Sequence, residues 1–213
     1  MIIARTLSDQ AYEVIRERIL SSEFEPMSPI RQDALSLELG VSKVPLREAL
    51  ARLGQDGLIG SHPNRGFFVL PLSSVEAQDV FNLRLKIEPD AAAEGALAAT
   101  APDRKHAEDA LKALELEEQT CGTRGVAFNR AFHVALVRPA GKIVTTAMVD
   151  RLHVIGERYV RKHLEPAGRD KRAQREHRTL LNAWLKQDSA AVRELCTDHI
   201  NATLRDLQAQ LKA

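Results

Sequence analysis

Three histidines in the second half of the chain have the residue type and placement that a metal site needs. His133 follows Asn129 by four residues, so the two side chains share one face of an expected helix. His177 and His199 fall on two later helices. Imidazoles from three antiparallel helices can meet inside a bundle, and neutral imidazole binds Zn, Ni, Cu or Fe. The alternative is a polar core network in which Asn129 hydrogen-bonds His133 without a metal.

Two arginines in the same part of the chain are candidates for binding an anion. Arg84 lies on an expected helix close to Val80 and Ile87. An arginine turned into a bundle interior needs an anionic partner, and a small carboxylate would supply one. The alternative partner is Glu88, one helical turn away. Arg158 is a second candidate for the same role.

The sequence predicts no catalytic residue. A metal-dependent enzyme would need a general acid or base close to the histidines. Glu176 is the obvious neighbour, but it adjoins His177 in sequence and should point to a different part of the helix surface. The remaining histidines of this part of the chain, His106, His153 and His163, are interpreted as surface or hydrogen-bonded residues.

A second group of residues, around residue 45, has the residue types of a helix that contacts DNA bases. Its buried stripe is expected to consist of Leu46, Ala49, Leu50 and Leu53. Lys43 and Arg47 are four residues apart on the exposed flank, where cations of this kind reach the acceptors of guanine. Ser42 is expected to cap the helix, and together with the first backbone amides it could hold a phosphate.

The elements around this helix have the order of a winged helix-turn-helix. Expected are helices over residues 5–21, 31–39 and 42–54, and strands at Leu58–Ile59 and Phe67–Leu70. The two strands are joined by a turn that contains Asn64, Arg65 and Gly66. At the tip of this wing, Arg65 could enter the minor groove or neutralise a phosphate.

From residue 74 onward only helices are expected. A short linker at Pro71–Ser74 predicts a DNA-binding domain over residues 1–72 and an effector-binding and dimerisation domain over residues 73–213. The expected helices of the second domain cover residues 74–99, 103–120, 124–137, 141–165, 169–187 and 189–212. The fold class is therefore mainly α, with a winged helix-turn-helix before an antiparallel all-α bundle of about six helices.

Composition bounds the function further. The 213 residues have a formal net charge of +1, and residues 1–70 carry 8 Lys+Arg against 9 Asp+Glu, so DNA binding must rest on local placement of cations. Two distant cysteines, Cys121 and Cys196, suit a reducing cytoplasm. No apolar run approaches the roughly 20 residues that cross a bilayer, and no secretory signal is expected at the N-terminus.

Residues 5–70 resemble the DNA-binding domain of GntR-superfamily transcription regulators. The resemblance rests on Val41–Leu50 (VSKVPLREAL), Arg52-Leu53, Asp56–Ile59 (DGLI) and Asn64–Val69 (NRGFFV). It implies that Lys43, Arg47 and the wing around Arg65 contact DNA. The family usually has Arg at the position of Lys43, and lysine does not make the bidentate base contact that arginine makes. It usually has Pro-Gly in place of Pro26-Met27.

Residues 74–210 resemble the FCD effector domain of the FadR subfamily. The resemblance rests on Phe81–Pro89 (FNLRLKIEP), Asn129–His133 (NRAFH), Glu176-His177 and His199-Ile200. In that family an Asp and three His bind a divalent metal, which helps to hold a small carboxylate effector. The resemblance therefore implies a Zn or Ni site at Asn129, His133, His177 and His199, with Arg84 on the effector. Asn129 stands where the family often has Asp, which implies weaker metal binding.

The combined prediction is a cytoplasmic, homodimeric transcription regulator, expected to be a repressor, with a palindromic DNA operator and a small organic acid as partners. Two other classes stay open: a metal-dependent enzyme, and a winged-helix interaction module without an effector. Salt-dependent duplex binding that Arg47→Ala removes would favour the regulator. Substrate turnover with indifference to DNA would favour the enzyme, and an apolar filled pocket without metal would favour the module.

Overall fold

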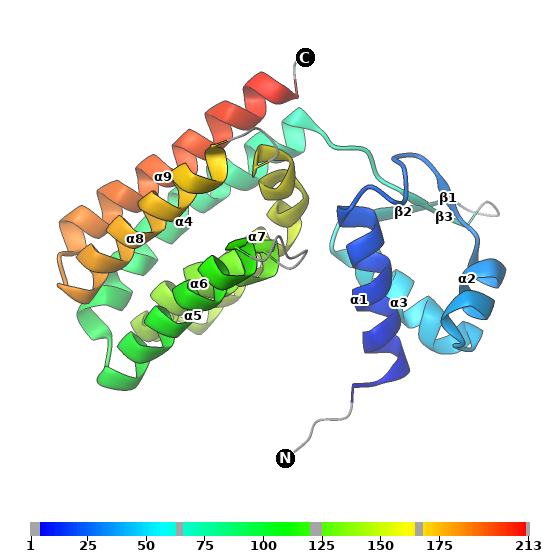
Figure 1. Ribbon diagram of the computed structural model, residues 1–213, viewed down its shortest axis with the longest axis horizontal. Coiled ribbons are helices and arrows are strands. Elements are labelled where there is room, and N and C mark those ends of the chain that lie inside the picture. Colours follow the sequence, from blue (N-terminus) through cyan, green and yellow to red (C-terminus); the bar gives the residue numbers. More distant parts are fainter. Residues whose placement is uncertain (1–4, 63–65, 120–124, 165–167, 212–213) are drawn as a thin grey trace. The chain divides into compact units, whose positions relative to one another are not determined.

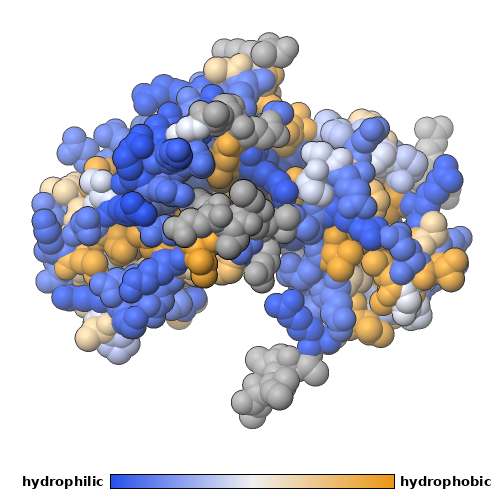
Figure 2. Space-filling view, viewed as in Figure 1, coloured by the Kyte–Doolittle hydropathy of each residue, from blue (hydrophilic) through white to orange (hydrophobic). Residues whose placement is uncertain are grey.

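A computed structural model describes residues 5–62, 66–119, 125–164 and 168–211 (Figure 1). The chain divides into two compact units, Met1–Leu72 and Ser73–Ala213. Each unit has its own hydrophobic core. On the face seen in Figure 2, hydrophilic residues cover most of each unit and hydrophobic residues form small groups between them. No described helix combines the length and the apolar character that spanning a membrane requires.

The first unit is built on three helices, α1 (Leu7–Leu20), α2 (Gln32–Leu39) and α3 (Lys43–Gln55). A capping box starts α1, because the Thr6 hydroxyl accepts from the Asp9 amide and the Asp9 carboxylate accepts from the Thr6 amide. Gly40 ends α2 at a φ of 63°, a left-handed conformation that favours glycine. The core between the helices contains Ile15 and the expected stripe of α3, all fully buried.

The wing is a three-stranded antiparallel sheet rather than the expected two-stranded ribbon. The strands β1 (Pro29–Ile30), β2 (Ile59–His62) and β3 (Gly66–Val69) lie in the order β1-β3-β2. The extra strand is only two residues long, too short to show any alternation in the sequence. Met27 turns the chain into it at a φ of 64°, and its amide donates to the Val69 carbonyl at 2.9 Å. Met27 thus adopts a backbone conformation in which glycine is the less strained residue.

The second unit is entirely helical in its described part. Its elements are α4 (Ser74–Ala98), α5 (Ala101–Gln119), α6 (Gly125–Val137), the 3₁₀ turn η1 (Arg138–Ala140), α7 (Ile143–Leu164), α8 (Arg169–Leu185) and α9 (Ser189–Gln210). The predicted fold class is confirmed. One boundary was wrong, because Pro102 does not separate two helices. It lies in the first turn of α5, where the missing amide hydrogen breaks no helical bond.

Helix α4 is the centre of this unit. It packs against α6, α7, α8 and α9, and it lies side by side with α9 along much of its length (Figure 1). Close approach to the end of α6 requires Gly95, since a Cβ there would lie 2.1 Å from the Leu136 carbonyl oxygen. The same oxygen accepts a hydrogen bond from the buried indole of Trp184 at 3.1 Å. Side chains on the inner face of α4 therefore contact several other helices at once.

Candidate functional site

The exposed flank of α3 carries the predicted DNA-contacting residues. Leu46, Ala49, Leu50 and Leu53 are each 0% exposed. Ser42, Lys43 and Arg47 are all exposed on the opposite side of the helix. Ser42 occupies the N-cap position of α3 but its side chain makes no capping hydrogen bond, so that part of the prediction was wrong. Pro45 has no amide hydrogen and the Leu46 amide donates to the Ser42 carbonyl, so the first-turn amides without an intrahelical partner are those of Lys43 and Val44.

The same flank is connected to α2 by two side-chain pairs. The Lys43 ammonium lies 2.8 Å from the Asp33 carboxylate, and the Arg47 Nε donates to the Gln32 amide oxygen at 3.4 Å. The hydrogen bond and charge of Lys43 lower the pKa of Asp33. All four residues line a groove of about 590 Å³, which also includes Gly66 at the start of β3. Asn64 and Arg65, predicted at the wing tip, lie outside the described residues.

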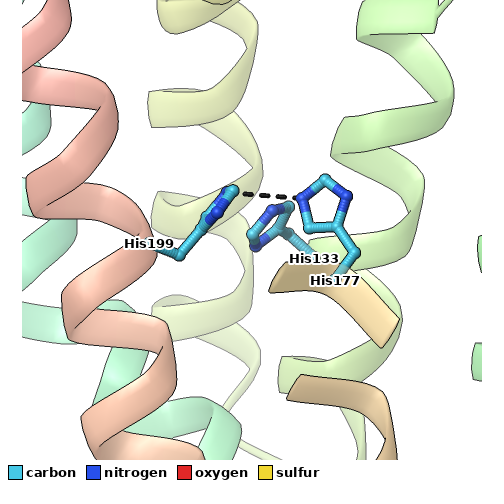
Figure 3. Close-up of side chains that lie close together, drawn as sticks. All are labelled: His133, His177 and His199. Carbon is cyan, nitrogen blue, oxygen red and sulfur yellow. Dashed lines mark hydrogen bonds between the residues drawn. The ribbon is translucent and has the colours of Figure 1, made fainter. Parts of the chain in front are cut away.

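In the second unit, three helices bring the predicted histidines together (Figure 3). His133 on α6, His177 on α8 and His199 on α9 each offer a ring nitrogen, and these atoms lie within 4.8 Å of one another. The Nε2 atoms of His177 and His199 are 3.3 Å apart. Two nitrogens bound tetrahedrally to one Zn²⁺ at about 2.0–2.1 Å would be separated by roughly 3.3 Å. The spacing therefore suits two ligands of a single ion.

Carboxylates behind the cluster hold two of these rings. His133 Nδ1 lies 2.7 Å from Glu88 Oε1, and His199 Nδ1 lies 2.7 Å from Glu176 Oε2. A carboxylate accepts a hydrogen bond, so each contact places the ring hydrogen on Nδ1 and leaves the lone pair on Nε2. Carboxylates behind metal-binding histidines commonly act in this way. Among the described residues, buried His133 Nε2 has no hydrogen-bond partner in the protein.

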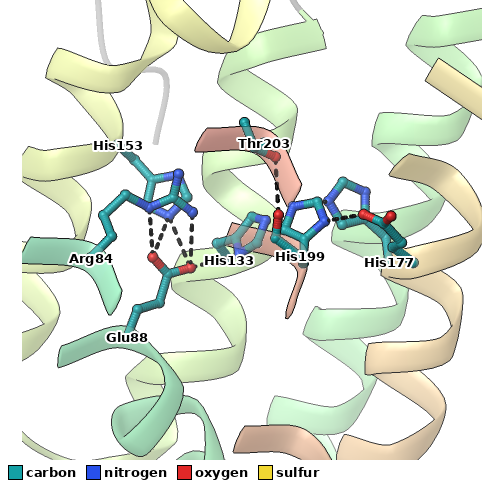
Figure 4. A network of polar contacts seen from close by, with 8 residues as sticks. Arg84, Glu88, His133, His153, His177, His199 and Thr203 are labelled. Carbon is teal, nitrogen blue, oxygen red and sulfur yellow. Dashed lines mark hydrogen bonds and ion pairs between the residues drawn. The ribbon is translucent and has the colours of Figure 1, made fainter. Parts of the chain in front are cut away.

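Glu88 is the hub of a larger buried network (Figure 4). Its carboxylate accepts from Arg84 at 2.8 and 3.2 Å, and His153 Nε2 lies 3.2 Å from both of its oxygens. The Arg84 and Glu88 side chains are only 3% and 1% exposed. Burial by itself would raise the pKa of Glu88, but Arg84 and the two histidines His153 and His133 lower it well below its usual range. Glu88 is therefore a buried anion that binds three other side chains.

Two histidines of the cluster, His133 and His177, are neutral at ordinary pH. Burial is the main cause in each case: it lowers the pKa of His133 to about 3 and that of His177 well below its usual range. The neighbouring His199, His133, Arg84 and His153 lower the pKa of His177 further. A metal ion binds the neutral form of imidazole, so no proton has to be displaced from these rings before coordination.

A small cavity adjoins the cluster. Its walls consist of Arg84, Asn129, Val160, His163, Leu164, Ala173, His177, His199 and Thr203. The volume is about 20 Å³, close to what one water molecule requires. Asn129 thus lies beside the histidines, and no Asn129–His133 hydrogen bond occurs among the described side chains. Arg158 is not part of these walls; its guanidinium lies 5.6 Å from the centre of the Tyr159 ring.

Three residues of this site were not predicted from the sequence. The sequence indicated Glu88 only as the alternative partner of Arg84, and the structure contains this ion pair. His153 had no motif around it and is separated from Glu88 by 65 residues. Glu176 was expected to point away, yet it contacts His199 from α8. The helical spacing of Arg84 and Glu88 was an available signal, whereas His153 offered none.

A winged helix joined to a helical bundle with an internal histidine cluster is the architecture of a DNA-binding regulator with a sensory domain. Comparison with known families gives the assignment. Residues 7–69 match the bacterial regulatory proteins of the gntR family, and residues 79–202 match the FCD domain. The chain belongs to the GntR family of transcription regulators and carries an FCD domain. These families and the curated relatives are transcription regulators rather than enzymes.

The chain is similar to several regulators over nearly its full length. It is 26% identical to the HTH-type transcriptional repressor GlaR of Escherichia coli (strain K12), over 89% of this chain and 90% of that protein. It is also 26% identical to the HTH-type transcriptional regulator YdhC of Bacillus subtilis (strain 168), over 95% of this chain and 92% of that one. The solved structure of E. coli McbR/YncC has the same fold, with a TM-score of 0.79, 19% identity, and coverage of 98% and 100%.

Proposed function

We propose that this protein is a homodimeric repressor whose DNA affinity is controlled by a small carboxylate and a divalent metal ion in the FCD domain. The observation that carries the proposal is the cluster of three imidazoles, two of them buried, beside a cavity whose walls include Arg84 and Asn129. Buried His133 Nε2 and His177 Nδ1 have no hydrogen-bond partner among the described residues, and a protein interior does not normally leave such nitrogens unpaired. A ligand that accepts their lone pairs explains the arrangement.

The metal would be held by His133, His177 and His199, with the Asn129 amide oxygen as a fourth ligand. The donor set suits Zn²⁺ or Ni²⁺, because both bind imidazole readily. When bound, the metal supplies a positive centre to which a carboxylate can coordinate. Asn129 contributes no charge, so we expect the site to bind metal less tightly than one with Asp at this position.

The effector would bind next to Arg84, whose guanidinium is already paired with Glu88. A cavity of about 20 Å³ holds a metal-bound water but no organic acid. Binding must therefore enlarge the cavity, and a carboxylate that attracts Arg84 would compete with Glu88 for it. Arg158 is the second candidate for effector binding, although it would have to reach the ligand from outside the described cavity.

DNA would be contacted by Ser42, Lys43 and Arg47 on α3 and by the wing residues Asn64, Arg65 and Gly66. Two copies related by a two-fold axis would read a palindromic operator in the cytoplasm. The relative named as a repressor supports this direction of control. The effector changes DNA affinity only by as much as it favours one state of the dimer over the other.

The decisive experiment measures metal and small molecules in the purified full-length protein. Inductively coupled plasma mass spectrometry should find Zn or Ni near one ion per chain, and native mass spectrometry should find an organic acid. His177→Ala should lose the metal. His106→Ala, which changes an exposed histidine on α5, should keep it. Equal metal binding by both variants would overturn the proposed metal centre. So would a failure of the wild type and of both variants to bind added Zn²⁺.

DNA binding is tested separately. Duplexes selected from a random pool by the wild-type protein serve as the probe, and analytical ultracentrifugation gives the number of chains per duplex. Two chains on a two-fold sequence are expected. Selection of no sequence, or binding of one chain to an asymmetric site, would contradict the proposed dimer without affecting the metal result.

A further inference from the structure

The groove between α2 and α3 contains an acidic side chain whose presence is not explained if α3 alone contacts DNA. Asp33 places a carboxylate on this groove, and its side chain is 84% exposed. A negative charge on a surface that meets DNA is repelled by the phosphates. Such a residue is costly there unless its oxygens accept hydrogen bonds from the DNA or its charge is balanced.

Lys43 supplies that balance. Its ammonium donates to Asp33 Oδ1 at 2.8 Å, while the Lys43 side chain is itself 63% exposed. One carboxylate oxygen is used in this contact, and among the described residues the other makes no hydrogen bond, so it can accept from outside the protein. The pair thus presents a donor and an acceptor next to each other at the open side of the groove.

A G·C base pair presents the complementary pattern in the major groove. Guanine offers the acceptors N7 and O6, and the neighbouring cytosine offers the N4 amino donor. Lysine can donate to guanine, and aspartate can accept from cytosine. An A·T pair, whose adenine amino group lies next to the thymine O4 acceptor and methyl group, does not present two adjacent acceptors followed by a donor.

We propose that Asp33 is a specificity-determining residue, which accepts from the cytosine of the same G·C pair whose guanine Lys43 contacts. The inference rests on the proposed contact of Lys43 with DNA. It also accounts for lysine at this position. A single ammonium bridges the carboxylate and one base, whereas bidentate reading by arginine would need both of its donors on guanine.

A simpler role for Asp33 is to stabilise the start of α2, because it lies in the first turn of that helix. The two roles differ in what they change. Loss of a helix-end interaction lowers the stability of the fold and affects all DNA sequences equally. Loss of a base contact changes the preference at one base pair and leaves the others as they were.

The test compares Asp33→Asn with Glu38→Gln in the full-length protein. Glu38 is also an exposed acid on α2, but it pairs with Arg18 and does not line the groove. Duplexes are selected from a random pool at one fixed salt concentration, and each base pair of the selected site is then varied. Asp33→Asn should lose about tenfold preference for one G·C pair per half-site, whereas Glu38→Gln should keep the wild-type pattern.

A double-mutant cycle with Lys43→Ala completes the experiment. Each single change should affect the same base pair, and the double variant should show little further loss there. If Lys43→Ala loses its base preference while Asp33→Asn keeps the wild-type pattern, the role of Asp33 is overturned and the reading surface stands. If Lys43→Ala binds every duplex like the wild type, the proposed surface itself is wrong. Lower thermal stability of Asp33→Asn with unchanged base preferences would assign Asp33 to the helix end alone.

Discussion

The groove on the first unit and the histidine cluster in the second unit use charged side chains in opposite environments. Lys43 and Asp33 pair in water, with side chains 63% and 84% exposed. Arg84 and Glu88 make the same type of ion pair at 3% and 1% exposure. Exposed pairs contribute little to stability and can exchange partners, whereas a buried pair cannot lose one member cheaply. The exposed Lys43–Asp33 pair suits a surface that binds and releases DNA, and the buried Arg84–Glu88 pair suits a fixed internal centre.

The contrast between the exposed and the buried ion pair is tested most directly by Glu88→Gln. The change leaves the Arg84 guanidinium buried without its anion, which typically costs about 3–5 kcal/mol of unfolding free energy. Chemical denaturation of the full-length protein measures it. The matched control is Glu94→Gln on the same helix, whose carboxylate pairs with Lys142 at 44% exposure and should cost less than about 0.5 kcal/mol. Equal small losses in both variants would remove the contrast between the two ion pairs.

Glu176→Gln should have the next largest effect, on metal rather than on folding. Glu176 lies behind His199 and is 30% exposed, so solvent can compensate for part of its charge. Changes behind a ligating histidine typically reduce metal affinity by about 10- to 100-fold. Zn²⁺ titration against a chromophoric chelator gives the affinity. A variant that binds Zn²⁺ as tightly as the wild type would show that His199 does not depend on this carboxylate.

Arg47→Ala should affect DNA binding and leave the stability of the fold nearly unchanged. Its side chain is exposed and, within the described part of the chain, hydrogen-bonds only to Gln32. Loss of one good base contact weakens binding by about tenfold or more. Fluorescence anisotropy with a selected duplex measures the affinity, and the metal content serves as an internal control. Unchanged affinity would exclude Arg47 from the reading surface.

The smallest effect is expected for the stability of Lys43→Ala. An exposed ion pair contributes at most about 1 kcal/mol, and often much less. Thermal melting with and without added salt should therefore give nearly the same midpoint for Lys43→Ala and the wild type. A loss of stability as large as that of Glu88→Gln would mean that the exposed ion pair in the groove contributes as much to the stability of the fold as the buried pair.

Much of this architecture could be read from local patterns. The helical spacing of Leu46, Ala49, Leu50 and Leu53 predicted which face of α3 is buried. The helices of the second unit were placed within a few residues, because prolines and glycines mark their ends. The third strand could not be predicted, since Pro29–Ile30 is too short to form a pattern. Pro26-Met27 showed a departure from the family pattern, but not that Met27 adopts a positive φ.

The candidate sites divide in the same way. Residue type and spacing on single helices determined that Lys43 and Arg47 share a face, and the family resemblance selected His133, His177 and His199. Only the tertiary structure decided that Glu88 contacts His153, 65 residues away, and that Glu176 supports His199. Helical periodicity is a property of the local backbone and can therefore be recognised in the sequence. The rotation and crossing of packed helices depend on all of their contacts together, and no short segment encodes them.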